Sequence, residues 1–105
     1  ALQEQEQVRQ RVEIQAWRTA SEAEQARTTR QQMQQALARI QQSAALQARA
    51  YELGESPLAD LLLARRNALE AQLAADTASL DAMQAHARLL LDSHRLWSAP
   101  GAAVH

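Results

Sequence analysis

The chain has 105 residues and a formal net charge of −1, with arginine and acidic residues interspersed along both halves. This balance excludes the basic surface typical of proteins that bind nucleic acid or anionic lipid, and the absence of cysteine excludes disulfides and thiolate metal sites. Aromatic residues make up only 3% of the chain and much of its apolar fraction is alanine, which predicts a thin core.

Residues 1–53 contain no glycine or proline and predict one continuous helix. Small and apolar residues recur along it in alternating steps of three and four, a heptad pattern typical of left-handed coiled coils. The predicted seam consists of Ala16, Thr19, Ala23, Ala26, Arg30, Met33, Leu37, Ile40, Ala44, Gln47 and Tyr51.

Residues 54–56 predict a sharp turn. Gly54 can adopt the left-handed conformation just past a helix end. Ser56 can cap the next helix, and Pro57 suits a first helical turn because no amide proton is needed there. The segment therefore predicts a short reversal between two antiparallel helices.

Residues 57–97 predict the second helix, with its own heptad pattern. The predicted seam consists of Leu62, Arg66, Leu69, Leu73, Asp76, Leu80, Met83, Ala87, Leu90, His94 and Trp97. Together the two segments predict an all-α fold, a long antiparallel two-helix coiled-coil hairpin over residues 1–97.

Two registers fit a short turn. One places Leu37 opposite Asp76, and the other places Arg30 opposite Asp76. We favour the second because it pairs a seam base with a seam acid, and an unpaired charge among apolar neighbours is costly.

Several apolar side chains lie off both seams, and they predict a second contact surface, so that the hairpin forms part of a larger bundle. They are Val8, Ile14, Trp17, Leu61, Leu63, Leu89, Leu91 and Leu96. Residues 98–105 combine a breaker with small residues and predict a disordered tail. Because the chain starts at Ala1 without an apolar signal segment, we expect a processed chain or an excised fragment.

Neither catalysis nor metal binding is indicated by the titratable residues. His86 and His94 are separated by two helical turns, about 12 Å, and no spacing typical of a metal site occurs. No nucleophile with an adjacent base and no phosphate-binding loop is present either. We therefore expect a protein that is not an enzyme and has no metal or other cofactor. No stretch approaches the roughly 20 apolar residues that a membrane-spanning helix needs.

Residues 48–71, around the turn, carry a specific pattern. An aromatic and an apolar residue precede Gly54, and the small polar Ser56 follows it. The run Asp60-Leu61-Leu62-Leu63-Ala64 then leads to Leu69-Glu70-Ala71. This segment resembles the hairpin tip of the TolC family of outer membrane efflux proteins. The similarity continues more loosely to Leu90 and covers the first helix only by its periodicity.

Two departures from the family narrow what the resemblance implies. The family commonly closes the second helix with a leucine and a glycine, where this chain has His94-Arg95-Leu96-Trp97. The family also builds an outer membrane barrel from β-strands, for which this chain has no segment. The resemblance therefore implies a periplasmic hairpin of the C-terminal repeat rather than a whole channel.

The resemblance implies a function and partners as well. The full-length protein would be a trimer whose helices form a periplasmic tunnel, the periplasmic part of an outer membrane protein. The tip, Leu53, Gly54, Glu55 and Ser56, would dock to a periplasmic adaptor protein and through it connect to an inner membrane pump. Tyr51 and Leu58 would support the tip. The exported substrate, whether drug, metal ion or polypeptide, is not indicated.

Two other functions remain open. The adaptor, or membrane fusion protein, of the same pumps also contains a hairpin, and its tip resembles an Arg-x3-Asp-x3-Leu-x6-Ser pattern. Counting from Arg39 or Arg49 finds no such spacing. The other alternative is a coiled-coil dimerisation module unrelated to transport, in which the tip residues form only a turn.

Overall fold

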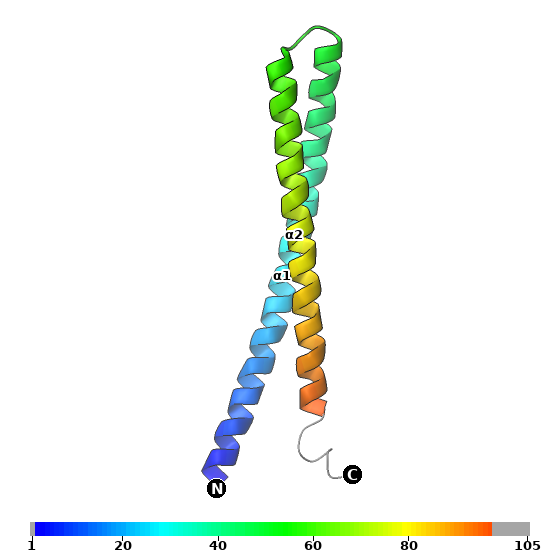
Figure 1. Ribbon diagram of the computed structural model, residues 1–105. Helices are drawn as coiled ribbons and strands as arrows, with labels where there is room; N and C mark the ends of the chain where they lie inside the picture. The colour runs from blue at the N-terminus through cyan, green and yellow to red at the C-terminus, as the bar shows by residue number, and fades with distance from the viewer. Residues whose placement is uncertain (1, 98–105) are drawn as a thin grey trace. The chain divides into compact units, whose positions relative to one another are not determined.

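The computed structural model describes residues 2–97 and contains two helices, α1 (Leu2–Glu52) and α2 (Leu58–Trp97), joined by a short turn (Figure 1). The prediction of an all-α helical hairpin is confirmed. On either side of the turn, α1 ends and α2 begins within one residue of the predicted positions, a difference inherent in assigning helix ends. The predicted disordered tail lies outside the described residues. Neither helix combines the length and apolarity that crossing a bilayer requires, over the residues described.

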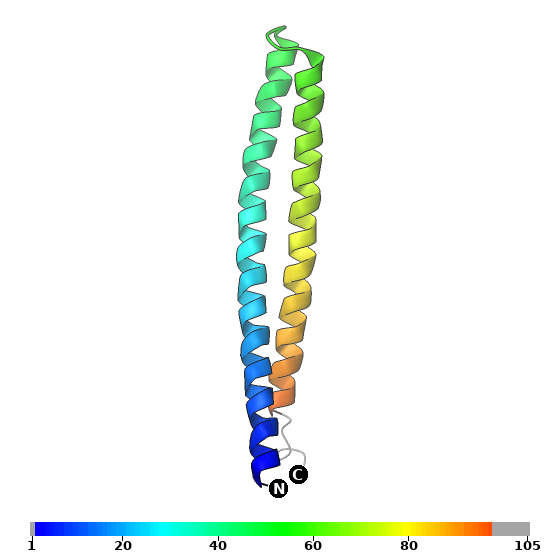
Figure 2. The same ribbon diagram turned by 90° about the vertical axis from the view of Figure 1, so that its left-hand side faces the viewer.

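The chain divides into two compact units. The first, residues 28–80, contains the turn and is called the turn unit here. The second comprises residues 2–27 and 81–97 of the described chain and is called the terminal unit. Within the turn unit, α1 and α2 run side by side in Figure 2, and α2 passes in front of α1 in Figure 1. A hydrogen bond between Gln41 and Gln72 joins them.

In the turn unit, α1 turns its predicted seam toward α2. Met33, Leu37, Ile40, Ala44 and Gln47 are all partly buried, whereas Arg30 and Tyr51, also assigned to the seam, are exposed. Both side chains end in a polar group. Burying that group without a hydrogen-bond partner costs more free energy than leaving it hydrated. The prediction for α1 is therefore correct except at these two positions.

The predicted seam of α2 is wrong in this unit. Its leucines are exposed, at 55% for Leu62, 72% for Leu69, 68% for Leu73 and 59% for Leu80. Arg66 and Asp76 are exposed too. The face turned toward α1 is a different row with the same period, consisting of Leu61, Ala64, Ala68, Ala71, Ala75 and Ala78. Alanines let two helices approach closely, so the smaller row makes the contact.

The terminal unit has the same division of faces. Thr19 and Ala23 of α1 are buried, and Ala85, Leu89 and Asp92 of α2 are partly buried. The expected seam residues Met83, Ala87, Leu90 and His94 are exposed instead, and the side chain of Trp97 is outside the described part.

A polar contact joins the two helices of the terminal unit. The hydroxyl oxygen of Thr19 lies 2.5 Å from Asp92 Oδ2 and 2.9 Å from the carbonyl oxygen of Gln15. The Thr19 hydroxyl has one proton and donates it to one acceptor at a time, and the Asp92 carboxylate is the stronger of the two acceptors. The hydroxyl therefore donates to Asp92. Thr19 therefore lies opposite Asp92 in this unit.

The favoured register is also wrong. In the turn unit, Gln41 Nε2 donates a hydrogen bond of 3.4 Å to Gln72 Oε1. The favoured register would place Gln72 opposite Gln34, roughly 10 Å from Gln41 along α1. The observed pairing is instead that of the alternative, in which Leu37 lies opposite Asp76. In the terminal unit, the contact between Thr19 and Asp92 excludes the favoured register independently.

Apolar side chains outside the contact between the helices are numerous, as expected. Five of the eight residues assigned to a second surface are exposed: Val8, Ile14, Trp17, Leu63 and Leu91. Leu61 is buried at 5% exposure and Leu89 is partly buried, because both belong to the row that faces α1. The side chain of Leu96 is outside the described part.

Candidate functional site

The turn closes α1 with a Schellman motif built from backbone groups. The amide of Gly54 donates to the carbonyl of Tyr51 at 3.0 Å, and the amide of Glu55 donates to the carbonyl of Ala50 at 2.8 Å. These are the two hydrogen bonds that define the motif, with a left-handed residue between them. The end of α1 is thus closed by main-chain hydrogen bonds, in which the side chains of Leu53 and Glu55 take no part.

Gly54 supplies the left-handed residue. Its φ is +73°, a conformation that side-chain-bearing residues rarely adopt. A Cβ added at this position would meet no atom within 4 Å. The requirement for glycine is therefore set by backbone conformation alone and not by close packing.

Ser56 has a different role from the predicted helix cap. Since α2 begins at Leu58, the residue directly before the helix is Pro57, whose carbonyl accepts a 3.2 Å hydrogen bond from the amide of Asp60. The hydroxyl oxygen of Ser56 instead accepts a 2.7 Å hydrogen bond from Gln47 Nε2. This bond ties the turn back to the last part of α1. The sequence assigned Gln47 to the seam, but nothing in its spacing identified Ser56 as its partner.

The predicted tip residues lie together around this turn and are largely exposed. Leu53 is 61% exposed, Leu58 is 48% exposed, and Tyr51 is 40% exposed. Glu55 is exposed and Ser56 is partly buried. The tip therefore presents apolar side chains to solvent at the point where the chain reverses.

The charge around the tip is acidic. Glu52, Glu55 and Asp60 contribute three carboxylates, and Arg49 contributes the one guanidinium between residues 49 and 60. Apolar side chains surrounded by carboxylates are suited to a partner that is apolar and basic. We find no arrangement of these residues that would perform a reaction.

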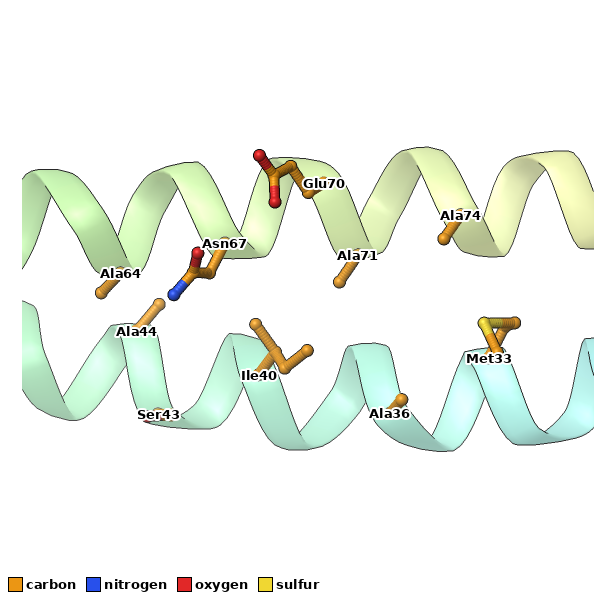
Figure 3. A pocket seen from close by; sticks show the side chains of 10 residues that line it. All are labelled: Met33, Ala36, Ile40, Ser43, Ala44, Ala64, Asn67, Glu70, Ala71 and Ala74. Carbon is orange, nitrogen blue, oxygen red and sulfur yellow. The ribbon is translucent and has the colours of Figure 1, made fainter.

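A groove of about 510 Å³ runs along the contact between the helices in the turn unit (Figure 3). Its lining comprises Met33, Ala36, Ile40, Ser43, Ala44, Ala64, Asn67, Glu70, Ala71 and Ala74. Figure 3 shows the Ile40 side chain between the two helices and the Glu70 carboxylate lying over α2, outside the space between the helices. The groove exists because alanine methyl groups do not fill the space beside the contact. The sequence did not predict it because the alanine row was not assigned to this face.

The titratable residues of the described chain do not gather into a metal site. Among them, no three histidine, aspartate or glutamate side chains are close enough to share an ion. His86 and His94 are both exposed on α2. That the protein has no cofactor and no catalytic activity remains a prediction from the sequence.

Comparison of the chain with protein-family models, curated proteins and solved structures finds no match. The resemblance of residues 48–71 to the TolC-family tip therefore remains a prediction. Function has to be argued from the turn and from the faces that the hairpin exposes.

Proposed function

We propose that the chain is a periplasmic hairpin in the tunnel wall of an outer membrane efflux or secretion channel of the TolC type. Its tip docks to a periplasmic adaptor protein, which links the channel to an inner membrane pump. In this role the hairpin is a passive wall and a docking point. The full-length protein is a homotrimer, and no catalytic step is assigned to this chain.

The presence of two apolar faces on α2 supports the proposed wall. One face, the alanine row, contacts α1, and the other carries exposed leucines roughly 150° away around the helix. A helix in a closed wall touches a neighbour on each side, so it needs apolar contact surfaces on both. A hairpin that acts alone in water has no use for the second face.

The tip supports the proposed docking. Because backbone hydrogen bonds hold the turn, the Leu53 and Glu55 side chains can contact a partner without loss of the turn itself. Such an end-on contact is small, so a few side chains would dominate its energy. The surrounding carboxylates favour a basic surface on the adaptor.

The proposal is tested by reversing the charge of Glu55 in the full-length protein. Glu55→Arg should reduce export and crosslinking to the adaptor, because it opposes a basic partner, while expression and trimer formation stay normal. Glu22→Arg is the matched control, since Glu22 is an exposed acid on α1 far from the turn in the sequence. It should leave export unchanged.

A second variant separates docking from a simple turn. Leu53→Trp enlarges an exposed apolar side chain at the tip and should also reduce adaptor crosslinking. If Glu55→Arg and Leu53→Trp both leave export and crosslinking at wild-type levels, the docking role is wrong and residues 53–56 form only a turn.

A further inference from the structure

The exposed leucines of α2 form a continuous stripe within the turn unit. Leu62, Leu69, Leu73 and Leu80, named here the outer stripe, are each more than half exposed. At 100° per residue their spacing places them within about 40° of one another around the helix. They are therefore one narrow apolar line and not scattered surface leucines.

The spacing of the outer stripe is symmetric about its centre. The steps between successive leucines are seven, four and seven residues, so the stripe has the same spacing in either chain direction. If a second copy of α2 runs antiparallel, Leu62 meets Leu80 of the other copy and Leu69 meets Leu73. Each leucine of the stripe then has a leucine opposite it, in the layers typical of an antiparallel coiled coil.

The charges within the stripe obey the same symmetry. Arg66 and Asp76 occupy the two heptad positions between the leucines, and both are exposed. The antiparallel pairing that matches the leucines also places Arg66 opposite Asp76 of the other copy, twice per pair. A parallel pairing would place Arg66 against Arg66 and Asp76 against Asp76, and like charges in contact oppose association.

Both charged side chains can reach a second copy at little cost. Arg66 Nε donates to Glu70 Oε1 at 3.2 Å, and the side chains in this pair are 74% and 63% exposed. Asp76 Oδ1 accepts from Gln72 Nε2 at 3.0 Å on the helix surface. Exposed contacts of this kind contribute little to stability, so the Arg66 and Asp76 side chains can leave them to contact a second copy.

We propose that the outer stripe is a homodimerisation surface on which a second copy of this chain packs in antiparallel direction, centred near Ala71. This interaction does not rest on the proposed channel role. An antiparallel pair points its two turns in opposite directions, whereas a tunnel wall points all tips the same way. The dimer and the proposed wall therefore cannot use the stripe at the same time.

One residue opposes the pairing. Glu70 lies roughly 80° around the helix from the stripe centre, on the flank where the same residue of the second copy approaches it. Like charges at this flank weaken the dimer. Glu70→Gln should therefore tighten it, whereas a dimer formed through a face distant from Glu70 would not change.

The first test measures self-association of the 105-residue chain by analytical ultracentrifugation. Leu73→Glu should weaken the dimer by roughly 100-fold or more, because it buries a carboxylate in two leucine layers. Leu46→Glu is the matched control, since Leu46 is 65% exposed but lies on α1. It should not change the dissociation constant. A wild-type chain that stays monomeric at all concentrations, or equal effects of the two variants, would overturn the proposal.

A second test uses charge exchange. Arg66→Asp alone and Asp76→Arg alone should each dimerise weakly, because each faces like charges in its own pair. An equimolar mixture of the two variants should form a heterodimer near wild-type strength, since every charge then meets its opposite. A mixture no stronger than either variant alone would contradict the assigned contacts.

A third test fixes direction with single cysteines, against a chain that has none of its own. Leu69→Cys mixed with Leu73→Cys should give a disulfide between the two variants on oxidation. Leu69→Cys alone should form little disulfide-linked dimer, because its two thiols are offset by about 6 Å along the antiparallel pair. Stronger crosslinking of Leu69→Cys with itself than with Leu73→Cys would show a parallel pair. If these tests fail, the proposed dimer is wrong. The channel role is tested separately by the export experiment.

Discussion

The two faces of α2 differ in the size of their side chains and in what they contact. The inner row is mainly alanine, with Ala75 at 4% and Ala78 at 6% exposure, and it lies against α1. The outer stripe is leucine and is exposed along its whole length. Larger apolar side chains are usually assigned to a core, yet here the smaller ones make the contact within the hairpin. Side-chain size alone therefore does not identify the inner face of a two-helix unit.

The division has an energetic consequence. Burial free energy scales with apolar area, at roughly 25 cal/mol per Å². An alanine row buries little area per residue, so the hairpin contact contributes little, while the greater potential for burial lies unused in the outer stripe. Assembly through that stripe is therefore expected to add to the stability of the chain.

The largest expected effect comes from two adjacent leucines on opposite faces. Leu61 is 5% exposed and Leu62 is 55% exposed. Leu61→Ala should lower the free energy of unfolding by about 2–3 kcal/mol, because it removes buried methyl groups and leaves a cavity. Leu62→Ala should change it by less than about 0.5 kcal/mol. Urea unfolding at concentrations where the chain is monomeric measures both, and a larger loss for Leu62→Ala would reverse the two faces.

A similar effect is expected from enlarging the inner row. Ala75→Leu should lower the free energy of unfolding by about 1–3 kcal/mol, because the close approach of the helices leaves no room for three more carbon atoms. Ala87→Leu provides the control, since Ala87 is exposed on the same helix. If thermal unfolding shows Ala75→Leu to be neutral or stabilising, the inner contact is looser than described.

A smaller effect is expected at the polar contact of the terminal unit. Thr19 is 8% exposed and lies against Asp92. Thr19→Val keeps the shape but removes the hydroxyl donor, and should cost about 1–2 kcal/mol by leaving a carboxylate oxygen without its partner. Thr29→Val, at an exposed position of α1, should cost almost nothing. Equal unfolding free energies for the two variants would show that the Thr19 contact adds no stability.

The smallest effect is expected at the turn that brings the inner faces together. Gly54→Ala should lower the free energy of unfolding by about 1 kcal/mol. The added Cβ meets no atom, so only the left-handed backbone conformation opposes the substitution. Gly54→Asn should cost less, since asparagine tolerates this conformation better. Calorimetry checks the order of the two variants, and a cost well above that of Ala75→Leu would point to a packing role for Gly54.

Much of the fold was predictable because local chemistry determines it. The absence of glycine and proline from the helices, together with the left-handed Gly54, predicted two helices and a sharp turn close to the observed bounds. The seam of α1 was also predictable in most positions, because α1 has one dominant apolar row. Similarly, the exposed tip followed from the position of the turn.

The inner face of α2 was not predictable from periodicity. Its alanine row and its leucine stripe both repeat every 3.5 residues, so the pattern shows two candidate faces and does not choose between them. The heptad stepping that began at Leu62 followed the leucine row, and the choice of register rested on pairing Arg30 with Asp76. Both charges are in fact exposed, so neither needed a partner inside the hairpin.

The face that α2 turns toward α1 is tested most directly by thiol labelling of two single-cysteine variants. Ala75 is 4% exposed and Leu73 is 68% exposed, and the chain has no cysteine of its own to react. At a concentration where the chain is monomeric, Ala75→Cys should react with a maleimide at least about 10-fold more slowly than Leu73→Cys, because folding shields only the inner row. Slow labelling of Leu73→Cys together with rapid labelling of Ala75→Cys would show that the leucine stripe, and not the alanine row, faces α1.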